Sequence, residues 1–365
     1  MDRHDLPGVT AKDVAEAHQA DLNIQHEYGC RGLTYWFDEI RGIAFCLVEA
    51  PDKGAVERMH NHAHGLIPHQ IVEVDNRMVE TFLGWIEEVE SLPDKDRTVN
   101  GRTGISAYRI ILATELFTSN LAVRRNGHTG ARGPMQTFLE IVRNTVRDHG
   151  GSNVDPTDDI HLTSFVSVKD ALNCALSIQK CCRVQLSGCE FLPGMGISAG
   201  HPVTMGHDFF EEAIIQAKRL SRLAGRNVVM ISAEVSELAM RENVSVAGEV
   251  GIRLLNSGDE NFLKRITDIL EGCWSDSRLT VPGFCRKIGL SKSQLNRRLS
   301  ALTGFSPNEF IREFRLIQAL GMIEKREGNI SEIAYGTGFS SPSYFSHCFE
   351  NRFGLRPSIL FSESA

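Results

Sequence analysis

The C-terminal part of the chain repeats one pattern of apolar and polar positions. The segments Val281–Gly304 and Ile330–Gly354 each predict a short apolar helix that ends near a glycine, a serine-rich turn, and a second helix with apolar residues four positions apart. Each segment therefore predicts a helix-turn-helix unit, and the helical stretch Pro307–Arg326 joins the two units. The patterns superpose at a constant offset of 50, which aligns Leu295 with Phe345, Leu299 with Phe349 and Gly304 with Gly354.

The middle of the chain alternates apolar strands with amphipathic helices. A helix is expected over Met78–Val89, and the polar segment Ser91–Gly104 predicts a linker. This alternation is typical of an α/β domain. The expected elements are strand Tyr108–Leu116, helix Pro134–His149, strand Ile160–Val166, helix Val168–Cys182, strand Gly194–Ala199, helix Phe209–Ala224 and strand Asn227–Ser232.

The N-terminal residues predict a small βαββαβ module. Pro68 lies within the last expected strand and places that strand at a sheet edge, or starts it just after the proline. A further strand is expected at the extreme N-terminus. The other elements are helix Thr10–Gln25, strands Leu33–Trp36 and Ile43–Val48, helix Asp52–His64 and strand Leu66–Val74.

Charge is distributed unevenly along the chain. The whole sequence carries a net charge of -7, but residues 279–356 hold 11 Lys and Arg against 6 Asp and Glu, a net of +5. The remainder therefore stands at -12, from 28 basic and 40 acidic residues. A basic module on an acidic body places contact with a polyanion at the C-terminus.

Cysteine usage and hydropathy indicate a cytoplasmic protein. The nine cysteines are scattered and form no Cys-x-x-Cys pair, which favours a reducing compartment. The polar start of the chain is unlike a signal peptide, and no apolar run reaches membrane-spanning length. Neither export nor a membrane partner is expected.

The C-terminal module resembles the AraC/XylS family of transcription regulators. The resemblance is carried by L-S-K-S-Q-L-N-R-R-L-S-A-L-T-G-F-S-P-N-E-F and by N-I-S-E-I-A-Y-G-T-G-F-S-S-P-S-Y-F-S-H-C-F-E-N-R-F-G-L-R-P-S. It implies a seven-helix module with two recognition helices in adjacent major grooves of double-stranded DNA, and a lead-in helix is expected over Asn261–Cys273.

The faces of the two recognition helices predict which residues meet DNA. In the first helix Leu295, Leu299 and Leu302 should face inward, and in the second Tyr344, Phe345 and Phe349. Asn296 suits adenine and Arg297 suits guanine, whereas His347 stands where the family often has arginine and indicates weaker base recognition. The predicted DNA-contacting residues are Ser293, Asn296, Arg297, Arg298, Ser343, Ser346, His347 and Arg352; among these Arg298 and Arg352, together with Lys292 and Arg356, suit phosphate contacts.

Histidines with helical spacing mark the N-terminal module. His60 and His64 share one helical face, as do His18 and Asp21, and spacing alone leaves surface histidines without a ligand as an equal alternative. H-D-L-P-G-V-T-A-K-D-V-A-E-A-H-Q-A-D-L, Y-W-F-D-E and H-N-H-A-H-G-L resemble the nickel-binding ferredoxin-like family of actinomycetes. The resemblance implies nickel or another divalent metal on His18, Asp21, His60 and His64, with His4, Cys46 and Glu49 as helpers.

The middle domain resembles class III nucleotide cyclases. The segments I-L-A-T-E-L-F-T-S-N, M-G-I-S-A-G-H-P-V and D-F-F-E-E-A-I-I-Q-A-K-R-L-S-R-L-A-G carry this resemblance. It implies that Asp159, Asp208 and Arg219 keep family positions, whereas Glu115, Asp155 and Ile215 replace an aspartate, a lysine and an asparagine. Because losing one such group typically costs about a hundredfold in rate, no cyclase activity is expected. Nucleotide binding without turnover and a pure dimerisation platform both remain open.

Together these features predict a multidomain transcription regulator. Its fold class is an α+β ferredoxin-like sensor domain (1–76), a connecting helix and linker (77–104), an α/β cyclase-like domain (105–250) and an all-α DNA-binding domain (251–365). It is expected to be a homodimer that responds to a metal or small molecule, and to contact RNA polymerase if it activates transcription. The alternatives are a nucleotidyl cyclase coupled to a DNA-binding module and a metal-storage protein. The four cysteines Cys174, Cys181, Cys182 and Cys189 suit either core packing or a soft-metal or redox site.

Overall fold

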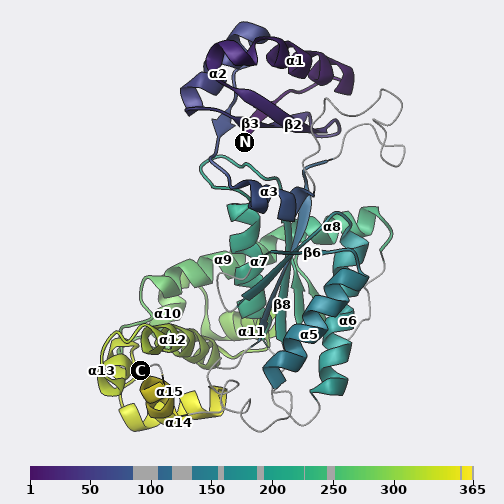
Figure 1. The fold of residues 1–365 in the computed structure, drawn as a ribbon. Coiled ribbons are helices and arrows are strands. Elements are labelled where there is room, and N and C mark those ends of the chain that lie inside the picture. Colours follow the sequence, from purple (N-terminus) through teal and green to yellow (C-terminus); the bar gives the residue numbers. More distant parts are fainter. Residues whose placement is uncertain are drawn as a thin grey trace.

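A computed structural model shows three parts that follow one another along the chain (Figure 1). It describes residues 1–84, 106–116, 134–154, 160–186, 193–225, 227–244, 251–353 and 356–363. The predicted linker Ser91–Gly104 lies outside these residues, as does the end of the helix expected over Met78–Val89. The described part of that helix, α3 (Asn76–Leu83), begins at the cap Asp75 and ends at Gly84.

The N-terminal domain has the predicted βαββαβ order. Its sheet runs β2-β3-β1-β4 with antiparallel pairing, and α1 and α2 lie together on one face (Figure 1). The last strand is shorter than expected, because only two residues after Pro68 pair with β1. The elements are β1 (Asp2–Asp5), α1 (Ala11–Ile24), the 3-10 turn η1 (Gln25–Tyr28), β2 (Arg31–Asp38), β3 (Ile43–Glu49), α2 (Lys53–Ala63) and β4 (Gln70–Ile71).

Local capping explains where the two N-terminal helices begin. Thr10 and Asp13 form a capping box, in which each side chain accepts a hydrogen bond from the other residue's backbone N–H. Asp52 caps α2 by accepting from the Ala55 N–H at 2.7 Å. Both helices begin at the residues expected from the sequence. The histidines within them therefore share the helical faces that their spacing predicts.

The middle domain is a six-stranded sheet with the order β10-β9-β8-β5-β7-β6. Alternate residues of β5 enter different cores: Ile110 and Leu112 pack with α5, α6 and α8, whereas Ile111 and Ala113 pack with α3 and α7. The elements are β5 (Arg109–Leu116), α5 (Pro134–Asp148), β6 (Ser152–Val154), β7 (Ile160–Phe165), α6 (Val168–Gln185), β8 (Pro193–Gly200), α7 (Glu211–Ala224), β9 (Val229–Ile231), α8 (Ala233–Arg241) and β10 (Ile252–Leu254).

The N-terminal domain shares a hydrophobic core with the middle domain. Trp36 and Phe45 on its sheet belong to the same buried cluster as Phe82 of α3 and Phe210 at the start of α7. The Arg109 guanidinium adds buried hydrogen bonds to the carbonyls at the end of α3. The helices α1 and α2, which carry the predicted metal ligands, cover one face of the N-terminal sheet. The other face of this sheet packs against the middle domain.

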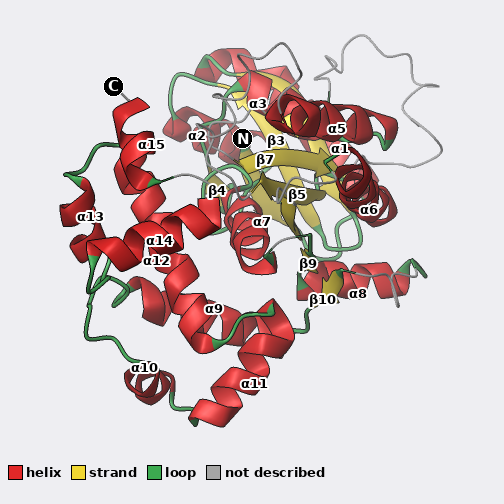
Figure 2. Ribbon diagram, turned by 90° about the horizontal axis from the view of Figure 1, so that it is seen from below, coloured by secondary structure: helices red, strands yellow, loops and turns green. Residues whose placement is uncertain are grey.

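The C-terminal module contains seven helices between Ser257 and Glu363 in the described chain, as the resemblance implied (Figure 2). Residues 252–254, which the sequence analysis assigned to this module without predicting a strand, form β10, and β10 pairs in parallel with β9 at the edge of the middle-domain sheet. The helices are α9 (Ser257–Glu271), α10 (Val281–Ile288), α11 (Lys292–Thr303), α12 (Pro307–Glu324), α13 (Ile330–Gly336), α14 (Pro342–Phe353) and α15 (Pro357–Glu363).

Two separate cores divide this module. The first includes α9 to α11 and the start of α12, together with Leu220, Leu223 and Ala224 of α7. The second is built from the end of α12 and from α13 to α15. The first helix-turn-helix unit is therefore continuous with the middle domain, whereas the second has a core of its own.

Candidate DNA-binding surface and metal centre

The predicted first recognition helix, α11, is fixed at both ends by its own sequence. Ser291 and Gln294 form a capping box at its start, and Gly304 ends it in the left-handed conformation, with φ of 81°. Leu295 and Leu299 are fully buried in the core beneath it. The polar residues predicted to meet DNA are exposed on other faces: Ser293, Asn296 and Arg297.

Arg298, a predicted phosphate contact, is turned toward α9. Its guanidinium donates to the Gly258 carbonyl at 2.8 Å and lies 4.2 Å from the ring centroid of Phe262. It also pairs with Asp259 at 3.5 Å. These contacts fasten the exposed side of α11 to the lead-in helix.

The predicted second recognition helix, α14, is organised by aromatic packing. Phe345 and Phe349 are fully buried, with ring centroids 5.5 Å apart. Ser343 and His347 are exposed and Ser346 is partly exposed. His347 shares a hydrogen bond of 3.1 Å with Asn351 one turn later.

One inward-facing assignment on α14 was wrong. Tyr344 was expected to face inward, but it is 51% exposed. The buried stripe consists of Phe345, Cys348, Phe349 and Phe353, at helical spacings of three and four residues. Tyr344 precedes this stripe by one residue and therefore points about 100° away from it.

Two further predicted phosphate contacts are engaged within the second unit. Arg352 forms an ion pair with Glu313 of α12, and its side chain is 9% exposed. Arg356 approaches Glu350 at 3.4 Å and remains well exposed. Arg356 therefore presents its charge to solvent far more fully than Arg352 does.

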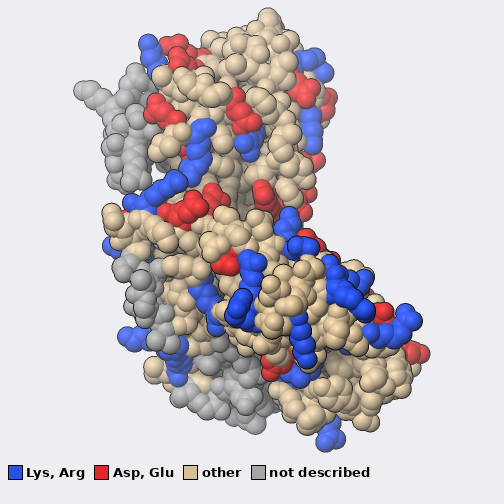
Figure 3. All heavy atoms as spheres, turned by 180° about the vertical axis from the view of Figure 1, so that it is seen from behind, with Lys and Arg blue, Asp and Glu red and all other residues tan. Residues whose placement is uncertain are grey.

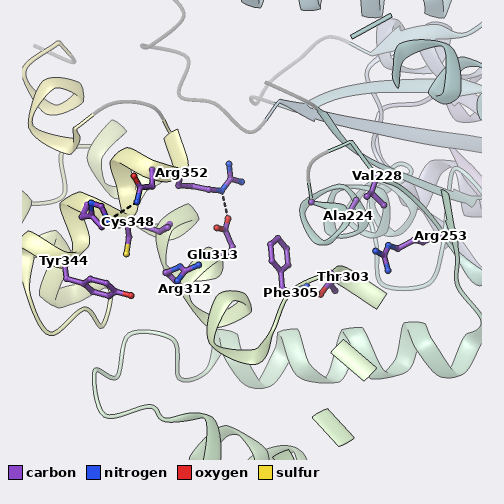
Figure 4. A pocket seen from close by; sticks show the side chains of 15 residues that line it. Ala224, Val228, Arg253, Thr303, Phe305, Arg312, Glu313, Tyr344, Cys348 and Arg352 are labelled. Carbon is purple, nitrogen blue, oxygen red and sulfur yellow. Dashed lines mark hydrogen bonds and ion pairs between the residues drawn. The ribbon is translucent and has the colours of Figure 1, made fainter. Parts of the chain in front are cut away.

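The outer face of α14 lines a pocket of about 610 Å³ shared with the middle domain (Figure 4). Tyr344, His347 and Asn351 form one side, and Ala224 and Val228 belong to the other. Basic side chains gather on the C-terminal module (Figure 3). The second unit thus holds two of its predicted DNA-contacting residues, His347 and Arg352, in a pocket opposite the middle domain.

The N-terminal histidines form a compact polar cluster. His60 Nδ1 lies 3.0 Å from Asp21 Oδ1 and 3.2 Å from His64 Nε2. The Leu66 N–H donates to His64 Nδ1, which leaves His64 Nε2 as the nitrogen that faces Asp21, at 3.1 Å. One ligand atom from each of Asp21, His60 and His64 lies within 4.8 Å of the others, a spacing suited to a metal ion.

Asp2 is the residue that sequence reasoning missed. It is 1% exposed and accepts from His60 Nε2 at 3.1 Å and from the Cys46 N–H at 3.1 Å. With His4 and Cys46 it forms a second group of metal-ligand type. In the antiparallel pairing of β1 with β3, Asp2 lies opposite Cys46, and this register brings Asp2 to the histidine cluster. Asp2 could have been predicted only if the register of β1 had been assigned from the sequence.

The two carboxylates control the protonation of the cluster. Burial alone would lower the pKa of His60, but its hydrogen bonds to Asp2 and Asp21 raise that pKa to about 9. Burial would raise the pKa of Asp2, but bonds from His4 and His60 hold it well below its ordinary value. His60 therefore carries a proton at neutral pH and joins the two groups.

His18 lies beside the cluster without joining its hydrogen bonds. Its ring centroid is 4.7 Å from that of Tyr35, and its buried Nε2 has no hydrogen-bond partner in the described chain. Burial lowers its pKa, so the ring is neutral and carries a free lone pair on one nitrogen. Glu49, a predicted helper, is exposed and pairs with Arg31 at 3.7 Å, away from the cluster.

The described residues at the predicted cyclase positions each have their own partners or surroundings. Glu115 faces α7, with Arg222 at 3.9 Å, whereas Arg219 pairs with Asp268 of α9 at 3.8 Å. Asp208 is exposed at the start of α7, and Asp155 and Asp159 lie outside the described residues. Ile215 and Arg219 line a pocket of about 640 Å³ that α9 helps to enclose.

The cysteines of α6 support packing rather than metal binding. Cys174 and Cys182 are fully buried in the main core of the middle domain, and burial raises the pKa of each thiol to about 12. Cys181 is partly exposed, and Cys189 lies outside the described residues. Thiols held protonated in an apolar core are poor metal ligands.

Comparison with known families confirms the resemblance at both ends of the chain. Residues 1–74 match the family model described as nickel responsive protein SCO4226-like. Residues 284–362 match a helix-turn-helix domain model. The C-terminal module is therefore a helix-turn-helix domain.

Individual relatives match parts of the chain. Histidine kinase P4 of Formosa agariphila is 40% identical over 28% of this chain, and the transcriptional activator RhaS of Mannheimia succiniciproducens is 31% identical over 31% of it. The chain spans only 8% and 37% of those two relatives.

Two solved structures also match parts of the chain. SCO4226 from Streptomyces coelicolor is 35% identical over 20% of this chain and 90% of its own, with a TM-score of 0.19. An adenylate/guanylate cyclase/hydrolase from Silicibacter pomeroyi is 22% identical over 38% of this chain and 82% of its own, with a TM-score of 0.31. Among the described residues, no helix is long and apolar enough to cross a bilayer.

Proposed function

We propose that the protein is a sequence-specific DNA-binding transcription regulator of the AraC/XylS type. The supporting observation is the pair of helix-turn-helix units, each with a buried apolar stripe beneath an exposed polar face. Asn296 and Arg297 of α11 are the main base-reading residues, because amide and guanidinium groups pair with adenine and guanine in the major groove. A homodimer would place two such modules on a repeated site.

Genome-wide occupancy mapping of the full chain tests this function. The wild type should occupy a set of promoters that share one sequence motif. Arg297→Ala should lose preference for that motif, whereas Arg241→Ala, at an exposed position at the end of α8, should not. Occupancy that follows no shared motif would overturn sequence-specific regulation.

The second unit should engage DNA after the first. In the described conformation His347 faces the middle domain across a pocket of about 610 Å³, which is too small for a DNA duplex. The unit that contains α14 must therefore move before both grooves are filled. In a footprinting titration, the half-site sensitive to Arg297→Ala should be protected at lower protein concentration than the other; simultaneous protection would contradict this order.

We infer that the N-terminal domain binds nickel or another divalent transition metal. Asp21, His60 and His64 would hold the ion, because imidazole and carboxylate ligands suit such metals and their ligand atoms already converge. His18, whose buried Nε2 has no hydrogen-bond partner in the described chain, is proposed as a further ligand that would have to move toward the other three. Asp2 orients His60 from behind, as outer carboxylates do in metal centres.

Equilibrium dialysis with nickel provides the test, with a control on the same helix. His60→Ala and His64→Ala should each lower nickel affinity at least about tenfold. His62→Ala should leave it unchanged, because His62 is exposed and bonds to the Tyr28 hydroxyl instead. Equal losses in all three variants, or none, would contradict the assignment. Promoter occupancy with and without nickel then shows whether the metal is the effector.

We also propose that the middle domain does not cyclise nucleotides. Ile215, at the position of the family's asparagine, cannot donate a hydrogen bond, and Glu115 is turned toward Arg222. Incubation with ATP or GTP and manganese should yield no cyclic product above that of Asp159→Ala. Product that disappears in this variant would establish an enzyme.

A further inference from the structure

We propose a second metal site in the N-terminal domain, formed by Asp2, His4 and Cys46 and suited to zinc. These residues bring a carboxylate, an imidazole and a thiol together, and one ligand atom from each lies within 4.8 Å of the others. Zinc accepts all three ligand types, whereas the site proposed above on α1 and α2 offers only nitrogen and oxygen ligands. The second site can therefore be occupied whether or not the first one is.

The register of two strands places the three side chains together. Asp2 and His4 are two residues apart on β1 and therefore point to the same face of the sheet. Cys46 of β3 lies directly opposite Asp2 in the antiparallel pairing, so its side chain shares that face. Asp2 contacts His60 of α2, which shows that this is the face covered by the two helices (Figure 1). The ligand set is thus built on paired strands and enclosed by α1 and α2.

The separation of His4 from Asp2 suits two ligands of one ion. His4 Nε2 lies 3.4 Å from Asp2 Oδ1. A charged hydrogen bond between such groups is usually about 2.7–2.9 Å long. Two ligand atoms on one tetrahedral zinc ion are about 3.3–3.8 Å apart, because zinc bond lengths are about 2.0–2.3 Å. The observed distance therefore fits coordination better than it fits a hydrogen bond.

The two oxygens of Asp2 face different partners. Oδ2 lies 3.1 Å from His60 Nε2. Oδ1 faces His4 and accepts a hydrogen bond from the Cys46 N–H at 3.1 Å. The carboxylate can therefore orient His60 with one oxygen and bind a metal ion with the other. Asp2 links the two sites in this way, so loss of its charge should weaken both.

The ligand atoms are buried, but a cation can reach them from the surface. Asp2, His4 and Cys46 are 1%, 3% and 7% exposed. Asp2 nevertheless lines a pocket of about 340 Å³, whose other lining residues include the exposed Glu49 and Asp52. An ion that enters by this route displaces the proton of the Cys46 thiol, because a thiol that coordinates a metal is deprotonated. Metal binding at this site is therefore accompanied by proton release.

Titration of the reduced, metal-free full chain with cobalt(II) tests the second site, because cobalt substitutes for zinc and absorbs light when a thiolate binds it. The chain should bind two equivalents, and one of them should produce thiolate-to-cobalt charge-transfer absorption in the near ultraviolet. Zinc(II) should abolish this absorption by displacing the cobalt. Cys46→Ser should lose the absorption together with one equivalent, and His4→Gln should weaken that equivalent. Asp2→Asn should weaken both equivalents about tenfold or more.

Matched variants define the outcomes. Cys30→Ser changes another buried cysteine of the same domain, which packs beside Ala55 and Met59, and should leave the absorption unchanged. His64→Ala should remove the other equivalent and keep the absorption, so failure of the first site can be told from failure of the second. Melting curves of the metal-free variants that match the wild type verify folding. Absorption that is absent from the wild type, kept in Cys46→Ser or resistant to zinc would overturn the proposal.

Discussion

The two helix-turn-helix units share one sequence pattern but are attached to the molecule in different ways. The first unit is packed into a core that includes α7 of the middle domain, so α11 is held by the body of the protein. The second unit closes its own core around Phe345, Phe349 and Phe353 and meets the first through α12. The difference indicates a rigid base-reading unit and a second unit that can move as a body.

Removal of one large core side chain from each unit should have the largest effect. Phe284 and Phe349 are both fully buried, and truncation to Ala typically costs about 3–5 kcal/mol of unfolding free energy. Phe284→Ala should lower the unfolding transition of the middle domain together with that of the first unit. Phe349→Ala should produce a separate early transition confined to the second unit, seen by hydrogen exchange. If each variant unfolds in a single transition that includes both units and the middle domain, the two units do not differ in how they are attached.

Acidification should also distinguish the body from the second unit. His201 lies between the rings of Phe45 and Tyr108, where the N-terminal and middle domains meet. Burial, reinforced by the nearby charge of Arg41 and opposed by Asp38, lowers its pKa from 6.5 to about 4. The unfolded chain therefore binds more protons between these values, and stability falls as pH drops from 6.5 to 4.

The size of this effect follows from the pKa difference. It amounts to about 1.4 kcal/mol for each pKa unit, or about 3.5 kcal/mol for the whole shift. His201→Phe keeps a ring in place and should flatten this part of the stability–pH curve of the body, measured by denaturant unfolding at each pH. The transition of the second unit should not change. If the stability–pH curve of His201→Phe keeps the wild-type slope between pH 6.5 and 4, groups other than His201 cause the loss of stability.

DNA specificity should depend more on the first unit than on the second. Arg297→Ala should cost about 1–3 kcal/mol of discrimination at one base pair, as bidentate contacts to guanine do. His347→Ala should weaken binding with little change in preference. Binding measured against a panel of single-base operator variants separates the two outcomes, and equal relaxation at both half-sites would contradict the division.

Much of the architecture could be predicted because it is encoded locally. The capping residues Thr10, Ser291 and Ser306 and the terminating glycines place helix boundaries within a few residues of those expected. That His60 and His64 share one face of α2 also follows from helical spacing. These features depend on residues close together in the sequence, so they can be predicted without knowing which distant segments are in contact.

The remaining features depend on contacts between distant segments. The role of Asp2 requires the β1–β3 register, and the shared core of α7 with α9 to α12 requires the packing of two domains. The exposed arginines illustrate the same limit. Sequence spacing shows that Arg298 and Arg352 leave the buried stripe, but not that each finds a partner within the protein.

An arginine that faces outward is free to bind phosphate only if it has no partner within the protein, and Arg298 has such partners. Its substitution should therefore have the smallest effect of those predicted here. Arg298→Ala should leave the salt dependence of DNA binding nearly unchanged, because its guanidinium already bonds to Gly258 and covers Phe262. It should instead cost about 0.5–1 kcal/mol of stability in the first unit, the usual value of an exposed cation–π contact. Lys292→Ala, at the exposed start of α11, should lower the slope of log affinity against log salt by about one. DNA affinities measured at several salt concentrations test this difference between the two variants. An equal fall in slope for both would mean that Arg298 leaves α9 to reach the phosphates. In that case α11 would be held less rigidly than its buried core indicates.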